Sequence, residues 1–344
     1  MPPADAVPCD KINRKKKQIL IIGILLYFLA SVSKANVPGT IFKDLLALGL
    51  DSTAISSLAA SYTYAYAISQ LLIGIYSDRY GGVRLLLIGG GLFAIGSLGF
   101  PLFDQLLTMQ FFRVITGAGA GVIFIGVAKL ISDLYPERFT IVFGIALFVG
   151  FCGVMAGTAP MVKLVRLLTW RYALLLGGAV SMVLMVNMIF LCPGTIKKTI
   201  TGQTLAPLFS LLKNLPMLRA CVAAATLSGL YHAVLSQIGI ISLMDGCCVS
   251  TQSAAAVMLA MSIFTAANSV LIGFLLKLFR NRRKLLQMTF NVCALTGCLL
   301  AAWSFCHSPS FRLLAVAYLL IAFPGGGFSL FGQSYQPWGC YLLR

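Results

Sequence analysis

Long apolar runs separated by short polar breaks make up almost the whole chain. A helix needs about 20 mostly apolar residues to cross the roughly 30 Å of hydrocarbon in a membrane, and ten runs fit that requirement. They cover residues 18–38, 52–77, 84–103, 106–131, 139–162, 168–192, 217–243, 253–277, 285–306 and 311–332. The short alternating segments that are typical of a membrane barrel are absent. The pattern therefore predicts an all-α fold, a polytopic transmembrane helix bundle.

Composition supports this interpretation. Of the 344 residues, 59% are hydrophobic and 10% are charged, and the mean hydropathy is +0.93, which is too apolar for a water-soluble globule. The first apolar run is too long for a cleavable signal peptide, and no clean small-residue cleavage site follows it. We therefore expect this run to remain as the first span.

The net charge of +17 follows membrane topology. A nucleic-acid-binding domain would gather basic and aromatic residues in one soluble region, and no such region exists here. If the N-terminus is cytoplasmic, the cytoplasmic segments hold 17 basic residues and the opposite segments hold 6, as the positive-inside rule requires. This count predicts that the N-terminus is cytoplasmic. It also predicts that membrane lipid, and not nucleic acid, surrounds the chain.

Sites for metal or catalytic chemistry are not expected. The ten cysteines form no CxxC pair and no Cys/His cluster with ligand spacing, so they are best explained as small apolar packing residues. Nucleotide-binding loops and HExxH motifs are also absent, and the two histidines have no convincing acidic partner. We expect no cofactor, no metal and no enzymatic activity.

The chain repeats itself at an offset of 199 residues, which places Gly74 over Gly273 and Arg84 over Arg283. Parallel repeated halves are a common construction of secondary transporters. The predicted organisation is a basic N-terminal segment, a six-helix half, a polar cytoplasmic linker and an incomplete second half with about four helices. These parts cover residues 1–17, 18–192, 193–216 and 217–344.

One turn between two spans carries a charged motif. The stretch "GIYSDRYGGVRLL", residues 74–86, contains Gly74, Asp78, Arg79, Gly81 and Arg84. Gly74 is expected to let neighbouring helices approach closely, Gly81 to permit a tight turn, and Asp78 to accept hydrogen bonds or pair with arginine. A solvated turn that merely obeys the positive-inside rule would explain the arginines and leave Asp78 unexplained.

This motif resembles the signature between helices 2 and 3 of the major facilitator superfamily. Further support comes from Arg113, Gly117, Gly119 and Gly121 in the fourth run and from "YPERFTIVFGI", residues 135–145, each similar to superfamily sequences. The resemblance implies two halves that move about a midplane cavity, with the charged turn acting as a cytoplasmic gate. Superfamily members have twelve spans, so the resemblance also implies a chain truncated before helices 11 and 12, or a ten-helix protein that folds as written.

Lys34 is the first candidate for contact with a substrate, because ionisable residues within spans are costly and rare. The surrounding "SVSKANVPG" resembles the first helix of the anion:cation symporter and organophosphate antiporter branches, in which an arginine near this point holds an anion. Lysine lacks the bidentate fork of arginine. Binding of an anion and snorkelling to the outer surface both stay open for Lys34.

Further candidates lie in the second and seventh runs. His232 follows Lys34 by 198 residues, close to the repeat offset, and is either a pH-dependent charge in the site or a neutral packed imidazole. Tyr62, Tyr66 and Gln70 form a polar stripe that either lines the cavity or joins helices, and Tyr66 and Gln70 are the further substrate candidates. Arg113 either joins the charge network or snorkels.

All nine carboxylates fall in loops or at the ends of the runs. A proton symporter commonly carries its proton on a buried carboxylate, so anion exchange or facilitated diffusion fits better. The expected function is transport of a small organic anion or polar metabolite by a secondary transporter, an antiporter type being favoured, in a bacterial inner membrane. The alternative is a transporter-like membrane protein, fragment or sensor, that does not transport. The sequence leaves the oligomeric state open.

Overall fold

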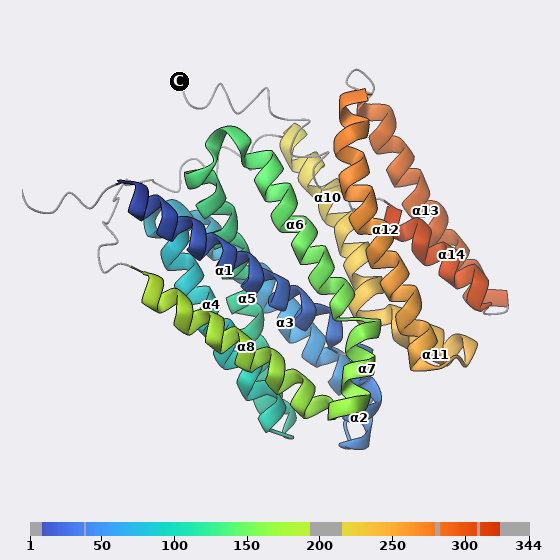
Figure 1. The fold of residues 1–344 in the computed structure, drawn as a ribbon. Helices are drawn as coiled ribbons and strands as arrows, with labels where there is room; N and C mark the ends of the chain where they lie inside the picture. The colour runs from blue at the N-terminus through green and yellow to red at the C-terminus, as the bar shows by residue number, and fades with distance from the viewer. Residues whose placement is uncertain (1–8, 38, 193–214, 279–282, 308–309, 324–344) are drawn as a thin grey trace, which may run out of the picture. The chain divides into compact units, whose positions relative to one another are not determined.

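A computed structural model describes residues 9–37, 39–192, 215–278, 283–307 and 310–323, and this part of the chain is helical, with no strand (Figure 1). The α-helices are α1 (Cys9–Asn36), α2 (Phe42–Ala47), α3 (Ser52–Tyr80), α4 (Gly82–Gly99), α5 (Leu106–Leu134), α6 (Phe139–Ala156), α7 (Ala159–Leu168), α8 (Trp170–Leu191), α10 (Leu215–Ala233), α11 (Gly239–Cys247), α12 (Thr251–Leu278), α13 (Arg283–His307) and α14 (Phe311–Ala322). The predicted helical fold class is confirmed.

Most predicted spans coincide with helices over their described residues, and one is interrupted. The fifth predicted span, 139–162, is interrupted after α6, and the chain bends by 47° between Ile141–Ala156 and Ala159–Leu168. The tenth, 311–332, is helical to Ala322, while residues 324–344 lie outside the described part. The seventh continues from α10 through a π-helical segment, Val234–Ile238, into α11.

Five helices of the described residues are long and apolar enough to cross a membrane, or six if the bent pair counts as one span. This number is lower than the ten predicted spans. Part of the difference lies in the extent of the described residues, since the tenth predicted span is described as a helix over 12 residues only, and α3 carries tyrosine, serine and glutamine along its length.

The chain divides into two compact units. The first comprises residues 1–37, 41–153 and 163–203, and the second comprises 38–40, 154–162 and 204–344. The predicted linker, 193–216, lies almost entirely outside the described residues, so the four-part division of the sequence stays a prediction.

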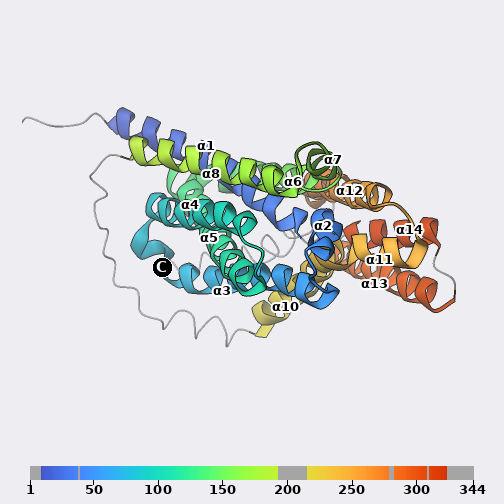
Figure 2. The ribbon, with the colours of Figure 1, turned by 90° about the horizontal axis from the view of Figure 1, so that it is seen from below.

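Helix α5 is the centre of the first unit, because it packs extensively against both α3 and α4. Its glycines make this possible: a Cβ on Gly119 would meet backbone atoms of Phe93 and Gly89 on α4. Helices α1 and α8 lie side by side in both views (Figures 1 and 2). The core between these helices contains Leu26, Phe93 and Ile123, all at most 1% exposed.

In the second unit, α14 packs against α13 and α12. The backbone of α14 approaches α13 closely at Gly297, where a Cβ would lie 2.7 Å from the carbonyl oxygen of Ala317. Small residues at such contacts are typical of helices packed within membranes.

The turn between α3 and α4 is tight and depends on Gly81. Its φ of 73° lies in the region that favours glycine, and α4 begins at the next residue. The expected role of Gly81 is therefore confirmed. At the other end of α3, the Asp51 carboxylate accepts a hydrogen bond of 2.9 Å from the amide of Ala54, an ordinary N-cap.

Candidate functional site

The polar stripe of α3 presents two stacked tyrosines inside the first unit. Tyr62 and Tyr66 lie one helical turn apart, their ring centroids are 6.2 Å apart, and the ring planes differ by 11°. Tyr62 is 1% exposed, and its hydroxyl donates a hydrogen bond of 3.1 Å to the carbonyl of Ala30 on α1. The stripe therefore both joins two helices and displays aromatic faces.

Lys34, near the end of α1, lies over the second of these rings. Its Nζ is 5.1 Å from the centroid of Tyr66, a distance at which a cation is attracted to an aromatic face. The hydroxyl of Tyr66 in turn lies beside the side chain of Gln70. The structure thus brings together three of the four residues that the sequence predicts for substrate binding.

Arg113 on α5 lies at the other end of the tyrosine pair. Its guanidinium carbon is 4.5 Å from the centroid of Tyr62 and 5.5 Å from that of Phe100. Nε donates to the carbonyl of Leu58 at 3.4 Å and Nη1 to the hydroxyl of Ser33 at 3.3 Å. Because Arg113 is only 2% exposed, it does not snorkel; it belongs to the packed interior.

We call the set Lys34, Tyr66, Tyr62 and Arg113 the cation–tyrosine ladder. The ion pairs found within the described residues are Lys129 with Asp133 and Arg171 with Asp104, so neither cation of the ladder has a carboxylate partner there. Nη2 of Arg113 also has no hydrogen-bond partner in that part of the chain. Lys34 is partly exposed beside the ring of Tyr66, so it can bind an anion, and an aromatic anion most favourably, whereas Arg113 is enclosed by its neighbours.

The glycines of the fourth-span motif hold the ladder in place. A Cβ on Gly117 would overlap the carbonyl of Tyr62, and a Cβ on Gly121 would lie 2.7 Å from the carbonyl of Tyr66. Because Arg113, Gly117 and Gly121 are spaced by four residues, they share the face of α5 that meets α3. The motif therefore positions both tyrosines against the arginine.

The gate motif lies at the α3–α4 turn. Arg79 is exposed, and Arg84 lies near the sulfur of Cys192 at the end of α8. The side chain of Asp78 lies outside the described residues, so its predicted pairing is untested. No described atom lies within 4 Å of a Cβ built on Gly74, so the close helix approach expected there stays a prediction. Within the first unit such approaches occur at Gly117, Gly119 and Gly121.

His232 belongs to the second unit and lies in the last turn of α10, two residues before the π-helical segment. Its ring centroid is 5.1 Å from that of Tyr231. Lys34 belongs to the first unit, so the predicted role of His232 as its counterpart in the second half of the repeat stays a prediction.

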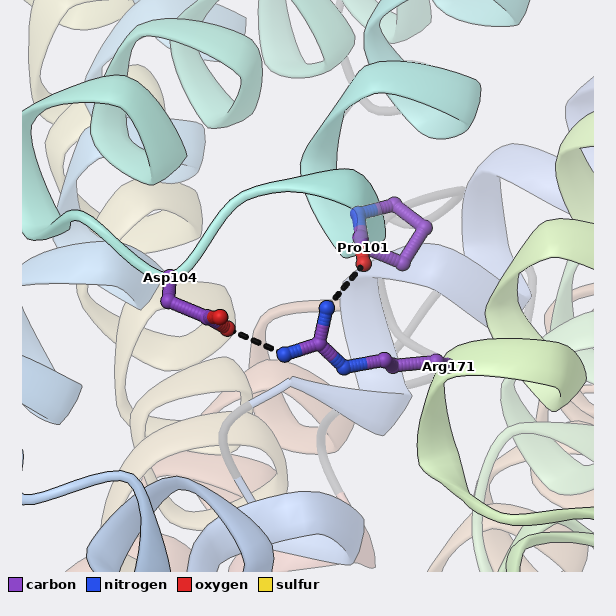
Figure 3. Close-up of polar contacts among 3 residues, drawn as sticks. All are labelled: Pro101, Asp104 and Arg171. Atoms are coloured by element: carbon purple, nitrogen blue, oxygen red, sulfur yellow. Dashed lines mark hydrogen bonds and ion pairs between the residues drawn. The ribbon is translucent and has the colours of Figure 1, made fainter.

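Arg171, at the start of α8, is a residue that the sequence placed only in the topological count. It donates to the carbonyl of Pro101 at 3.3 Å and pairs with Asp104 in the loop between α4 and α5 (Figure 3). Its guanidinium also lies 5.0 Å from the ring of Trp170. This cluster ties the α4–α5 loop to α8 within the first unit.

Ser33 is the residue of the site that sequence reasoning missed. It directly precedes Lys34, and its hydroxyl accepts the bond from Arg113. A serine beside a charged residue in an apolar run was the available signal, but only the packing of α1 against α5 reveals its partner.

Comparison with known proteins yields a family match over almost the whole chain. The family described as Major Facilitator Superfamily matches residues 10–338. The 4-hydroxybenzoate transporter PcaK of Pseudomonas aeruginosa is 31% identical over 150 residues, which cover 42% of this chain and 33% of that protein. The 3-(3-hydroxy-phenyl)propionate transporter of Escherichia coli is 24% identical over 330 residues, covering 86% of this chain and 76% of that protein.

These matches differ in their extent. The chain matches about a third of the length of PcaK and likewise of the quinolone resistance protein NorA of Staphylococcus aureus, to which it is 31% identical over 128 residues. The relatives are transporters and not enzymes, in agreement with the expectation from the sequence.

Solved transporter structures share the fold. The nucleoside transporter NupG superposes with a TM-score of 0.66 at 17% identity, covering 93% of this chain and 80% of that one. A D-xylose-proton symporter gives a TM-score of 0.66 at 18% identity, covering 89% and 79%. At these identities the likeness concerns the fold alone.

Proposed function

We propose that this chain, which belongs to the Major Facilitator Superfamily, carries a small organic anion across a membrane by alternating access, with Lys34 contacting the anion. The observation that supports this most strongly is the cation–tyrosine ladder, whose two cations have no carboxylate partner among the described ion pairs. Charge inside a membrane protein is costly unless it is compensated. An anionic substrate supplies that compensation.

The substrate class that best fits the ladder is a hydroxylated aromatic carboxylate. Tyr66, which is partly exposed, offers an aromatic ring on which a substrate ring packs favourably, Lys34 attracts the carboxylate, and Gln70 offers an amide for a hydroxyl. Two relatives are described as transporters of 4-hydroxybenzoate and 3-(3-hydroxy-phenyl)propionate, which supports the same class.

The proposed mode is exchange or facilitated diffusion, as in an antiporter or uniporter. The carboxylates of the chain lie in loops or near the ends of the apolar runs, including Asp51, Asp104 and Asp133. A proton carrier buried at mid-membrane, such as symporters commonly use, has no evident residue. We place the N-terminus in the cytoplasm on the basis of the distribution of basic residues, and the protein in a bacterial inner membrane on the basis of its resemblance to the family.

Uptake of labelled 4-hydroxybenzoate into proteoliposomes tests the proposal. We expect Lys34→Ala to lower uptake at least about tenfold, the factor that corresponds to a lost contact of 1.4 kcal/mol. Tyr66→Leu should lower uptake to a similar extent. Tyr66→Phe keeps the ring under Lys34 and should lower uptake much less. Lys43→Ala, at an exposed position of α2, is the matched control.

Uptake that is equal in Lys34→Ala and Lys43→Ala would remove Lys34 from the site. Competition by a panel of unlabelled aromatic, aliphatic and phosphorylated anions defines the substrate class, and the absence of competition by any aromatic carboxylate would overturn the class. Preloading the vesicles with unlabelled anion separates the modes, since exchange is accelerated by internal anion and proton symport by an inward proton gradient.

A further inference from the structure

Helix α7 lies between α6 and α8, and the proposed anion site does not use it. Helix α6 has 18 residues, hence a length of about 27 Å at 1.5 Å per residue, and by itself it nearly crosses the roughly 30 Å of hydrocarbon. The chain then bends by 47° into α7. Helix α7 ends at Thr169, whose φ of 70° interrupts the helix before α8 begins at Trp170. The length of α6 therefore leaves α7 at the surface of the membrane.

Contacts at the start of α8 indicate the same level. Arg171 pairs with Asp104 (Figure 3), which lies in the loop between α4 and α5, and both of these helices are long and apolar enough to span the membrane. A loop that joins two spans lies outside the hydrocarbon. Trp170 and Tyr172 flank Arg171, and such aromatic side chains are enriched at membrane–water interfaces. Because α7 directly precedes these residues, it also lies close to the membrane surface.

The sides of α7 differ in character. One side is buried, and its members are each at most 9% exposed: Met161, Val162 and Val165. At 3.6 residues per turn, Arg166 and Lys163 follow around the helix and form an exposed basic strip. Leu167 comes next, opposite the buried side, and is 82% exposed. The basic strip and Leu167 belong to the first unit, and an exposed leucine beside basic side chains is typical of a helix that lies in a membrane interface.

The basic residues of this segment are on the side of the membrane where they are least expected. With the predicted topology, the outer segments hold 6 basic residues, and three of them lie within residues 163–171. The positive-inside rule disfavours such a concentration outside. The sequence contains no acidic residue between Glu137 and Asp245, so neighbours along the chain do not balance this charge. The phosphates of lipid headgroups are the nearest source of negative charge at a membrane surface.

We propose that α7 binds an anionic phospholipid of the outer leaflet, with Lys163 and Arg166 holding the headgroup phosphate and Leu167 contacting the acyl chains. Arginine binds a phosphate through its planar fork, and lysine binds it as a compact charge. A zwitterionic headgroup is disfavoured because its own cation offsets the phosphate. A soluble phosphate is disfavoured because it offers nothing to the exposed leucine. This lipid site is independent of the proposed anion substrate.

Native mass spectrometry of the purified full chain in detergent tests the proposal, with phosphatidylglycerol and phosphatidylcholine added in turn. We expect phosphatidylglycerol to bind more tightly. Lys163→Gln combined with Arg166→Gln should weaken its binding by about fivefold for each charge removed and should affect phosphatidylcholine much less. Leu167→Ser should weaken both lipids at least about threefold, because it removes an apolar contact with the acyl chains. Lys43→Gln, which removes an exposed lysine of α2 beside Asp44, is the matched control and should change neither.

Equal affinity of the unmodified chain for the two lipids would overturn the site, and this comparison needs no variant to fold. Unchanged binding of phosphatidylglycerol in the double variant, or in Leu167→Ser, would likewise contradict it. Glycerol 3-phosphate carries the headgroup phosphate without acyl chains, so its displacement of phosphatidylglycerol at equal concentration would show a site for a soluble phosphate and not for a lipid. Lipid binding by a chain that takes up no anion would contradict the proposed function and leave the lipid site standing.

Discussion

Arg113 is the most constrained side chain of the first unit. A guanidinium that is 2% exposed has lost its hydration. Among the described residues, two long hydrogen bonds and contacts with two aromatic faces replace it. Cation–π attraction reaches about 2 kcal/mol or more when the groups are desolvated, so the faces of Tyr62 and Phe100 are a major part of what stabilises the charge. The planar shape of arginine is therefore as important here as its charge.

Replacing Arg113 by lysine should destabilise the protein although the charge is kept. Lysine cannot donate to Leu58 and Ser33 in the same fork, and it cannot stack on Tyr62. We expect a loss of about 2 kcal/mol, visible as a lower midpoint of thermal unfolding in detergent. Arg138→Lys, at an exposed position, is the control, and equal midpoints for the two variants would contradict the structural role of Arg113.

Single residues were predictable from the sequence to the extent that their chemistry was unusual for an apolar run. Lys34, Tyr66 and Gln70 were recognised because charge and polarity are costly in a membrane. Their arrangement was not predictable, since it depends on how α1, α3 and α5 pack. Two interpretations of Arg113 were open from the sequence, and only its burial between Tyr62 and Phe100 decides between them.

At the scale of elements, α5 acts as a spacer between two neighbours. Gly117 and Gly121 face the backbone of α3, whereas Gly119 faces that of α4. Residues four apart share one side of a helix and residues two apart lie on nearly opposite sides, so these glycines serve two different interfaces. The glycine pattern does not bind anything itself; it determines how closely the tyrosines approach Arg113.

Substitution of Gly117 by valine should therefore separate α3 from α5. A side chain there would collide with the backbone carbonyl of Tyr62, which cannot rotate away as a flexible side chain would. We expect strongly reduced yield of folded protein in membranes, measured by size-exclusion chromatography after detergent extraction. In the matched variant Gly177→Ala on α8, a Cβ meets no described atom within 4 Å; that variant should be neutral or slightly stabilising.

The Arg171–Asp104 ion pair drawn in Figure 3 should contribute little to the free energy of unfolding. Its side chains are 36% and 61% exposed, and exposed ion pairs contribute about 0 to 1 kcal/mol. We expect Asp104→Asn to lower the unfolding midpoint by no more than a few degrees, with the difference vanishing in high salt. A large loss that persists in high salt would show that the loop is held by this contact.

Helix positions were largely predictable because the lipid allows few alternatives. A backbone in hydrocarbon must satisfy its own hydrogen bonds, so apolar runs become helices, as at α4, α5 and α8. The ends and interruptions of the helices were harder to predict from the sequence. The break after α6 and the π-helical segment after α10 depend on tertiary packing, which hydropathy does not record.

At the scale of the whole molecule, charge and hydropathy carry different information. Hydropathy indicates how many segments cross the membrane, and the uneven distribution of basic residues indicates in which direction they cross. The family match over residues 10–338 agrees with the membrane-spanning fold that hydropathy indicates. Neither one identifies the substrate, since that depends on a few side chains.

Orientation can be tested with a native cysteine. Cys248 follows α11 and is exposed; with a cytoplasmic N-terminus and the predicted spans, it lies on the outer face, whereas the α3–α4 turn lies inside. In a variant that retains only Cys248, a membrane-impermeant maleimide should react in intact cells. In a variant whose single cysteine replaces the exposed Tyr80, it should react only after permeabilisation. The reverse labelling would mean that the basic residues cluster outside, and both the predicted topology and the cytoplasmic gate would then be wrong.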